Sequence, residues 1–204
     1  MSNNDMPFTS TRDVSQPSYS EQRGWYQFTC GHCGNSVNAY VAAIFPKDAS
    51  RVRWLLCTQC GNGSVLTEQG VIYPPAPAGP SLEGLPPDIE QAYKEARNCF
   101  SFKAYAACEQ VCRKILMYVG VEKGERECDT FENYLTHLEN EGYVTKPMKS
   151  WVEQIRKNGN KATHKLDNPG ETRAKSTLMF TAELLRLIYE MDYVSKHYGG
   201  TPPP

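Results

Sequence analysis

The residues of this chain best suited to chemistry are two short cysteine motifs of the same form. They read Cys30-Gly31-His32-Cys33-Gly34 and Cys57-Thr58-Gln59-Cys60-Gly61, with 23 residues between Cys33 and Cys57. Two such pairs supply the four thiolates that a tetrahedral zinc ion needs. The glycine after each pair permits a positive φ, which turns the backbone toward the sulfurs. We therefore expect one structural Zn²⁺ on Cys30, Cys33, Cys57 and Cys60.

Two alternatives for these cysteines are a pair of disulfides and four free thiols. The chain shows no signal peptide and has four further cysteines, so we expect a cytoplasmic protein in which disulfides are disfavoured. His32 is a further candidate ligand, but four cysteines complete the set, and we expect His32 to be a solvated loop residue. Four thiolates leave no coordination position for substrate, which excludes a zinc-dependent hydrolase.

A second set of candidate residues lies between Ile155 and His164, in the sequence IRKNGNKATH. Its glycine and asparagines are poor residues for a helix interior, and such a local break often marks a functional site. Arg156 and His164 suit the handling of phosphate, because a guanidinium neutralises phosphate oxygens and an imidazole can transfer a proton. Alternatively, Arg156 pairs with an acid of a neighbouring helix and His164 only packs or caps locally.

The elements that must position these residues divide the chain into five parts. Residues 1–23 are polar and predict a disordered arm. Residues 24–73 contain short β-branched and aromatic runs between turn residues, which predicts a small β zinc ribbon. Residues 74–87 hold six prolines and predict a semi-rigid linker, and residues 199–204 form a tail. Trp25, Tyr26 and Trp54 are candidates for stacking on bases, but in so small a module we expect them to build the core.

Residues 88–198 change to a helical period and predict an all-α bundle of about five helices. Asp88 is the expected cap of the first helix. Cys108 and Cys112 lie in a stripe of apolar residues at helical spacing, so we expect them to be buried core residues rather than ligands or nucleophiles. We expect helices over residues 88–99, 101–119, 129–140, 146–157 and 171–198.

Charge is balanced overall but uneven along the chain. The formal net charge is −1, and no apolar stretch approaches the roughly 20 residues of a membrane span, so we expect no membrane association. Residues 121–141 hold seven acidic and two basic side chains, whereas residues 144–175 hold eight basic and three acidic ones. The basic segment 144–175 is a candidate surface for the phosphates of RNA or DNA. Alternatively, the two segments neutralise each other.

The helical part resembles a bacterial family of domains of unknown function that also occurs in restriction-enzyme subunits and is grouped with the HEPN superfamily. The resemblance covers roughly Leu85 to Tyr193 and implies a HEPN-like fold. It rests on four stretches: LPPDI from Leu85 with Tyr93 and Ala96; Tyr105 to Leu116, which includes Arg113; Ile155 to Asn160 with His164; and the long closing helix.

In active ribonucleases of that superfamily, four to six residues separate an arginine from a histidine. Dimerisation brings two such motifs into one site that cleaves RNA without metal. Here seven residues separate Arg156 from His164, and Gly159 precedes Asn160 where an arginine would stand. The resemblance implies Arg156 and His164 as catalytic residues, assisted by Asn160 and Arg113. We expect a non-catalytic, zinc-containing module that binds nucleic acid or a protein, in phage defence or RNA-related regulation. The alternative is a metal-independent endoribonuclease that acts as a HEPN-type homodimer.

Overall fold

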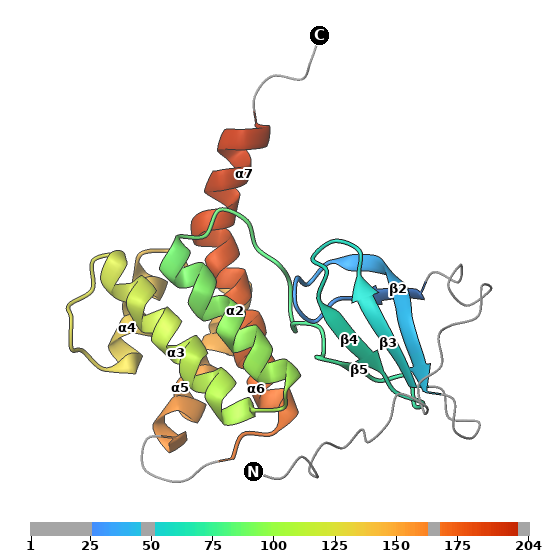
Figure 1. The fold of residues 1–204 in the computed structure, drawn as a ribbon. Helices are drawn as coiled ribbons and strands as arrows, with labels where there is room; N and C mark the ends of the chain where they lie inside the picture. Colours follow the sequence, from blue (N-terminus) through green and yellow to red (C-terminus); the bar gives the residue numbers. More distant parts are fainter. Residues whose placement is uncertain (1–25, 46–51, 163–167, 200–204) are drawn as a thin grey trace, which may run out of the picture. The chain divides into compact units, whose positions relative to one another are not determined.

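The chain divides into a unit of strands, Met1–Ala76, and a unit of helices, Pro77–Pro204 (Figure 1). The structure, a computed structural model, describes residues 26–45, 52–162 and 168–199, with only the backbone for Phe45 and residues 159–162. An antiparallel sheet with a cysteine cluster precedes the helices, as the sequence predicted. Each unit is described by itself.

The strand unit is a curled antiparallel sheet in which every strand pairs with its neighbour in sequence. Its core contains Phe28, Ala39, Val41, Ile44, Leu55 and Leu66, all of which lie on one face. The strands are β1 (Tyr26–Thr29), β2 (Ser36–Phe45), β3 (Val52–Cys57), β4 (Gly63–Leu66) and β5 (Ile72–Tyr73).

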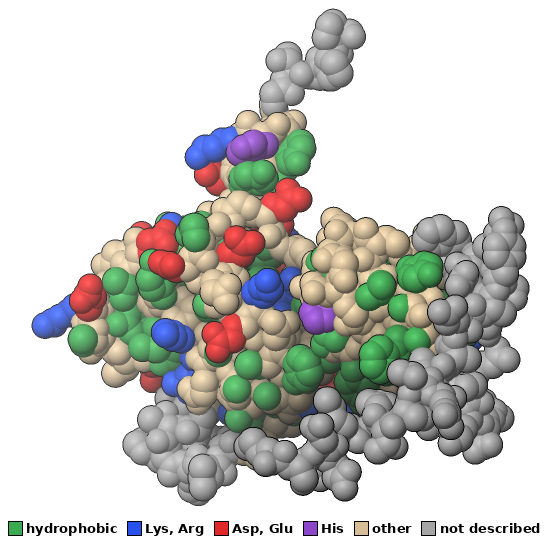
Figure 2. All heavy atoms as spheres, in the orientation of Figure 1, with side chains coloured by type: hydrophobic (Ala, Val, Ile, Leu, Met, Phe, Trp, Pro, Cys, Tyr) green, Lys and Arg blue, Asp and Glu red, His purple; other side chains and the backbone are tan. Residues whose placement is uncertain are grey.

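The opposite face of the sheet carries exposed aromatic side chains. Tyr40, Trp54 and Tyr73 are 44%, 49% and 53% exposed, and they alternate along their strands with core residues. The expectation that Trp54 builds the core is therefore wrong, because Leu55 takes the inward position beside it. Hydrophobic side chains also reach the surface of this unit in Figure 2. We call the face that carries Tyr40, Trp54 and Tyr73 the outward face of the sheet.

The described residues of the helical unit form five main helices and a short continuation of the last. A 3-10 turn (Lys146–Met148) leads into α5, and a π-helical turn (Arg186–Glu190) joins α6 to α7, which extends beyond the rest of the helical unit in Figure 1. None of the described helices is long and apolar enough to cross a membrane. The helices are α2 (Pro87–Ser101), α3 (Tyr105–Glu122), α4 (Phe131–Asn140), α5 (Lys149–Ala162), α6 (Glu171–Leu185) and α7 (Met191–Tyr198).

The helix ends differ in two places from the expectations. Pro86 precedes the first turn of α2 and Pro87 opens it, so Asp88 lies within that turn instead of capping it. The backbone of α5 stays helical through Gly159 to Ala162, so the break expected there is absent from the described part of the segment. Cys108 and Cys112 are fully buried on α3, as predicted, and pack in a core shared by all five main helices.

The proline-rich stretch packs on the helices over most of its length. Arg97 of α2 donates hydrogen bonds to the carbonyl oxygens of Ala78 (2.7 Å) and Gly79 (3.1 Å), and the Tyr93 hydroxyl donates to that of Pro80 (2.9 Å). Ala78, Leu82 and Leu85 pack against the helical core. Residues 77–86, which we expected to be linker, are thus part of the helical unit, because proline-rich backbone leaves carbonyl acceptors that Arg97 and Tyr93 can reach.

Candidate functional site

The four cysteines of the two motifs form one compact cluster. Their sulfur atoms all lie within 4.8 Å of one another. The Sγ atoms of Cys30 and Cys60 are 3.8 Å apart, as are those of Cys33 and Cys57. A tetrahedral centre with metal–sulfur bonds of about 2.3 Å has sulfur–sulfur edges of about 3.8 Å. The cluster can therefore hold a metal ion.

Two matching hairpin turns bring these cysteines together. Cys30 follows β1 and Cys57 ends β3, so the turns β1–β2 and β3–β4 present one pair each. Gly34 and Gly61 have φ of 75° and 72°, and each donates its N–H to the carbonyl of the first cysteine of its pair, at 2.8 and 2.9 Å. These values confirm the expected positive φ at both glycines. Any other residue at either position would strain the backbone.

His32 lies outside the cluster. Its ring Nε2 is 3.0 Å from the carbonyl oxygen of Gly63, and the side chain is exposed. This contact joins the turn of the first cysteine pair to the start of β4, just beyond the second pair. His32 therefore helps to hold the two hairpins together, and the four sulfurs remain the natural ligand set.

The cysteine environments differ in how readily each thiol loses its proton. Burial raises the pKa of Cys30 to about 12. A hydrogen bond from the backbone of Asn62 lowers the pKa of Cys60 to about 6, and the Asn62 side-chain amide also donates to this sulfur at 3.4 Å. A bound metal holds its cysteine ligands as thiolates. Metal binding to this cluster therefore releases protons and depends on pH.

Arg156 is engaged by α4 and by its own helix. Its Nη2 donates to Thr136 Oγ1 and to Glu139 Oε2, both at 3.1 Å, and its Nη1 pairs with Glu153. Its Nε is buried with no hydrogen-bond partner among the described residues. Lys149 also pairs with Glu139, at 3.0 Å, and the hydrogen bond from Lys149, followed by that from Arg156, lowers the Glu139 pKa. This arrangement corresponds to the ion-pair alternative for Arg156.

The structure does not show whether Arg156 lies close to the side chains of Asn160 and His164. Asn160 lies on the backbone of α5, but its side chain is not described, and His164 lies outside the described residues. Their roles stay predictions.

A buried ion pair that the sequence reasoning missed lies beside Arg113. Arg173 of α6 donates from Nε and Nη2 to the two carboxylate oxygens of Glu109, both at 2.8 Å, and Glu109 is only 5% exposed. Arg173 Nη2 also lies 3.4 Å from the carbonyl oxygen of Asn158. Arg113 stacks over the ring of Phe131 at 4.4 Å, and burial lowers its pKa while Glu109 raises it. One sequence feature could have indicated this ion pair: Glu109 directly follows Cys108 in the stripe of buried residues.

The match to a known family covers this helical part. Residues 94–198, just over half of the chain, match the family described as Domain of unknown function (DUF4145). The chain belongs to this family. The match begins within α2 and ends at the end of α7, so the cysteine cluster lies outside it. Comparison with curated proteins found no match, and comparison with solved structures found none either.

The basic segment of the DUF4145 domain is partly neutralised within the domain. Lys149 and Arg156 pair with Glu139, and Arg173 pairs with Glu109. Only Lys146, Lys157 and Lys175 among its described basic side chains have no ion-pair partner in the described part of the chain. The segment is thus a weaker candidate for binding phosphates than its sequence indicates.

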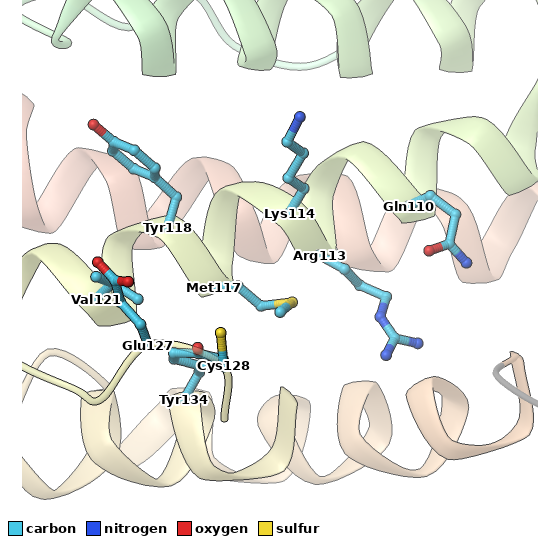
Figure 3. A pocket seen from close by; sticks show the side chains of 9 residues that line it. All are labelled: Gln110, Arg113, Lys114, Met117, Tyr118, Val121, Glu127, Cys128 and Tyr134. Carbon is cyan, nitrogen blue, oxygen red and sulfur yellow. The ribbon is translucent and has the colours of Figure 1, made fainter. Parts of the chain in front are cut away.

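An open groove runs along α3 of the DUF4145 domain. Its volume is about 490 Å³. Figure 3 shows Val121 and Glu127 at one end, Gln110 and Arg113 at the other, and Met117 in the middle. Cys128, whose φ is 61°, has an exposed side chain that lines the groove. The remaining lining residues are Lys114, Tyr118 and Tyr134.

Proposed function

We propose that this protein is a cytoplasmic, non-catalytic, zinc-stabilised module that binds single-stranded nucleic acid through the outward face of its sheet, in phage defence or RNA-related regulation. The observation that carries the proposal is the exposure of Tyr40, Trp54 and Tyr73 on one face of a small antiparallel sheet. Aromatic side chains on such a face stack on the unpaired bases of single strands, as in other sheet-based RNA-binding modules.

The register of the sheet places these aromatic residues on neighbouring rows. Trp54 pairs with Val65, which pairs with Tyr73, so the two aromatic positions lie two strands apart, or about 10 Å. Tyr40 pairs with Leu56, one outward position along β3 from Trp54. Bases splayed along one strand can therefore each meet a different ring. The described residues of this face include no charged side chain, so stacking would supply most of the affinity.

The metal in this proposal is one Zn²⁺ ion with a structural role. Four thiolates in a tetrahedral cluster suit zinc and close its coordination sphere. Cys30, Cys33, Cys57 and Cys60 would hold the ion and fix the two hairpins that present β2, β3 and β4. The absence of catalysis is supported by Arg156, whose guanidinium is used in contacts with α4 and Glu153.

Replacement of the outward aromatic residues tests the binding proposal. We expect Tyr40→Ala and Trp54→Ala each to weaken binding of a labelled single-stranded RNA roughly 5- to 150-fold, because a base–aromatic stack contributes about 1–3 kcal/mol. Fluorescence anisotropy with the zinc-loaded protein measures the change. Tyr198→Ala is the matched control, since Tyr198 is an exposed aromatic residue on α7. Equal affinities of all four proteins would contradict the proposal.

A second candidate function is a metal-independent endoribonuclease acting as a HEPN-type homodimer. It is favoured by the position of Arg113 and Arg173 around Glu109, beside Asn158 in the segment that continues to Asn160 and His164. The test is cleavage of labelled single-stranded RNA without added metal, by the wild type and by His164→Ala. The binding proposal expects no cleavage by either. Cleavage that is lost in His164→Ala would establish the second function instead.

A further inference from the structure

A polar hollow lies in the strand unit where β2 meets the turn of the second cysteine pair. Its volume is about 490 Å³, and it is lined by Val37, Asn38, Thr58 and Gln59. The first two residues belong to β2, and the last two belong to the turn between β3 and β4. The Thr58 hydroxyl donates a hydrogen bond to the carbonyl oxygen of Asn38 at 2.8 Å. This bond joins the turn to the strand and fixes the shape of the hollow.

The hollow adjoins one of the exposed aromatic rings. Alternate residues of a strand point to the same side, so Asn38 and Tyr40 share one face of β2 and lie about 7 Å apart along it. Both side chains are exposed. Tyr40 pairs with Leu56, and the same register places Thr58 opposite Asn38. The amide of Asn38 can therefore reach the edge of a base that stacks on Tyr40.

Two side-chain amides in this hollow are available to a ligand. Asn38 and Gln59 are exposed, and neither side chain forms a hydrogen bond within the described part of the chain. Asn62, which follows the same turn, differs because its amide donates to the Cys60 sulfur at 3.4 Å. A carboxamide carries an N–H donor beside a C=O acceptor. The hollow thus offers two such donor–acceptor pairs.

Adenine is the base whose edges match two carboxamides. Its amino group lies between two ring nitrogens, so the Watson–Crick edge and the Hoogsteen edge each present one donor beside one acceptor. An asparagine or a glutamine pairs with such an edge through two hydrogen bonds. Cytosine and uracil present a donor beside an acceptor on the Watson–Crick edge alone, and the Hoogsteen edge of guanine presents two acceptors. Adenine alone can therefore use both amides in this way.

We propose that the hollow is an adenine-selective subsite, in which Asn38 and Gln59 hold the two edges of one adenine while Tyr40 stacks on its face. This inference rests on the nucleic-acid binding proposed above and states which bases that surface prefers. Stacking is tolerant of sequence, whereas hydrogen bonds to base edges are not. The aromatic residues would then supply affinity, and the two amides would supply selectivity.

Affinities for short RNA homopolymers test the subsite. Fluorescence anisotropy with the full, zinc-loaded chain should show that labelled oligo(A) binds at least about fivefold more tightly than oligo(C) or oligo(U), since a two-bond pair discriminates by roughly that factor or more. Asn38→Ala and Gln59→Ala should each remove most of this preference and leave the affinity for oligo(U) unchanged, because a base with one matching edge can use the remaining amide. Retained binding of oligo(U) also shows that each variant is folded. Gln91→Ala, at an exposed amide of α2, is the matched control and should keep the preference.

A modified base separates hydrogen bonding from stacking. Oligo(A) made with N6,N6-dimethyladenine keeps the ring but has no amino hydrogen, so it should bind at least about fivefold more weakly than oligo(A). Equal binding of the two strands, or equal affinities for oligo(A), oligo(C) and oligo(U), would overturn the subsite and leave the proposed stacking function intact. Displacement of oligo(A) by an equal concentration of AMP would overturn it in favour of a site for free nucleotides. Binding of none of the strands would overturn both the subsite and the proposed function.

Discussion

Removal of the proposed zinc ion from the four-cysteine cluster is expected to unfold the strand unit and to leave the DUF4145 domain folded. A structural zinc site contributes apparent binding free energies of about 10–16 kcal/mol, which is comparable to the whole stability of a typical domain, about 5–15 kcal/mol. Among the described residues, the core on the inner face of the sheet is small, with eight buried hydrophobic residues that include Cys30 and Cys57 themselves. Without the ion, the positive charge that stabilises Cys30 and Cys57 as buried thiolates is lost.

Two measurements separate the units. With a strong chelator, the backbone amides of β2 and β3 should lose their protection from hydrogen exchange, while those of α3 and α6 stay protected. Cys57→Ser should have the same effect without chelator. Cys128→Ser is the matched control, because Cys128 is an exposed cysteine outside the cluster. Protection of the strands in a protein shown to be free of metal would refute the structural role.

Breaking the buried pair of Glu109 and Arg173 should strongly destabilise the DUF4145 domain. Arg173→Met is expected to lower the free energy of unfolding by about 3–5 kcal/mol, because it leaves a buried carboxylate without its bidentate partner. Thr177 Oγ1, at 3.4 Å from Glu109, is too weak a donor to replace Arg173. Burial lowers the pKa of Arg113, and the nearby carboxylate of Glu109 raises it in part. Arg113 can therefore compensate in part for the loss of Arg173, which favours the lower end of the range.

Urea unfolding, followed by helical circular dichroism, measures this loss. The double variant Glu109→Met with Arg173→Met should recover most of the stability, since an apolar pair of similar size needs no desolvation of charge. Lys149→Met removes one member of an ion pair whose lysine is 57% exposed, so it should cost no more than about 1 kcal/mol. If Arg173→Met costs as little as Lys149→Met, the buried pair is not a principal source of stability.

The parts of this protein that the sequence predicted depend on short-range patterns. The spacing of the cysteines gave the cluster, because each pair and its glycine form one local turn. Helical spacing likewise identified Cys108 and Cys112 as core residues. The alternation of β3 also indicates that Trp54 faces outward, because the neighbouring Leu55 is a core residue. Strict alternation with Leu55 was the better guide.

The pairings of charged residues could not be predicted in the same way. Glu109 and Arg173 are 64 residues apart in the sequence, and Arg156 pairs with Glu139, which is 17 residues away. Which acid meets which base depends on how α4, α5 and α6 pack on α3, and helical periodicity says nothing of that. The local charge balances gave the sign of each segment. They did not show that Glu139 holds both Lys149 and Arg156.

The proline-rich stretch that Arg97 and Tyr93 hold has a practical consequence for where this domain can be cut. A fragment that begins at residue 94, where the family match starts, lacks Tyr93 and every carbonyl that Arg97 binds. The fragment also lacks Leu82 and Leu85, so the part of the core against which they pack becomes exposed to solvent. Gly84 approaches Tyr193 so closely that an added Cβ would lie 2.3 Å from that side chain. The smallest piece able to fold alone therefore starts near Pro77, and the sequence boundaries of the family underestimate its physical boundary.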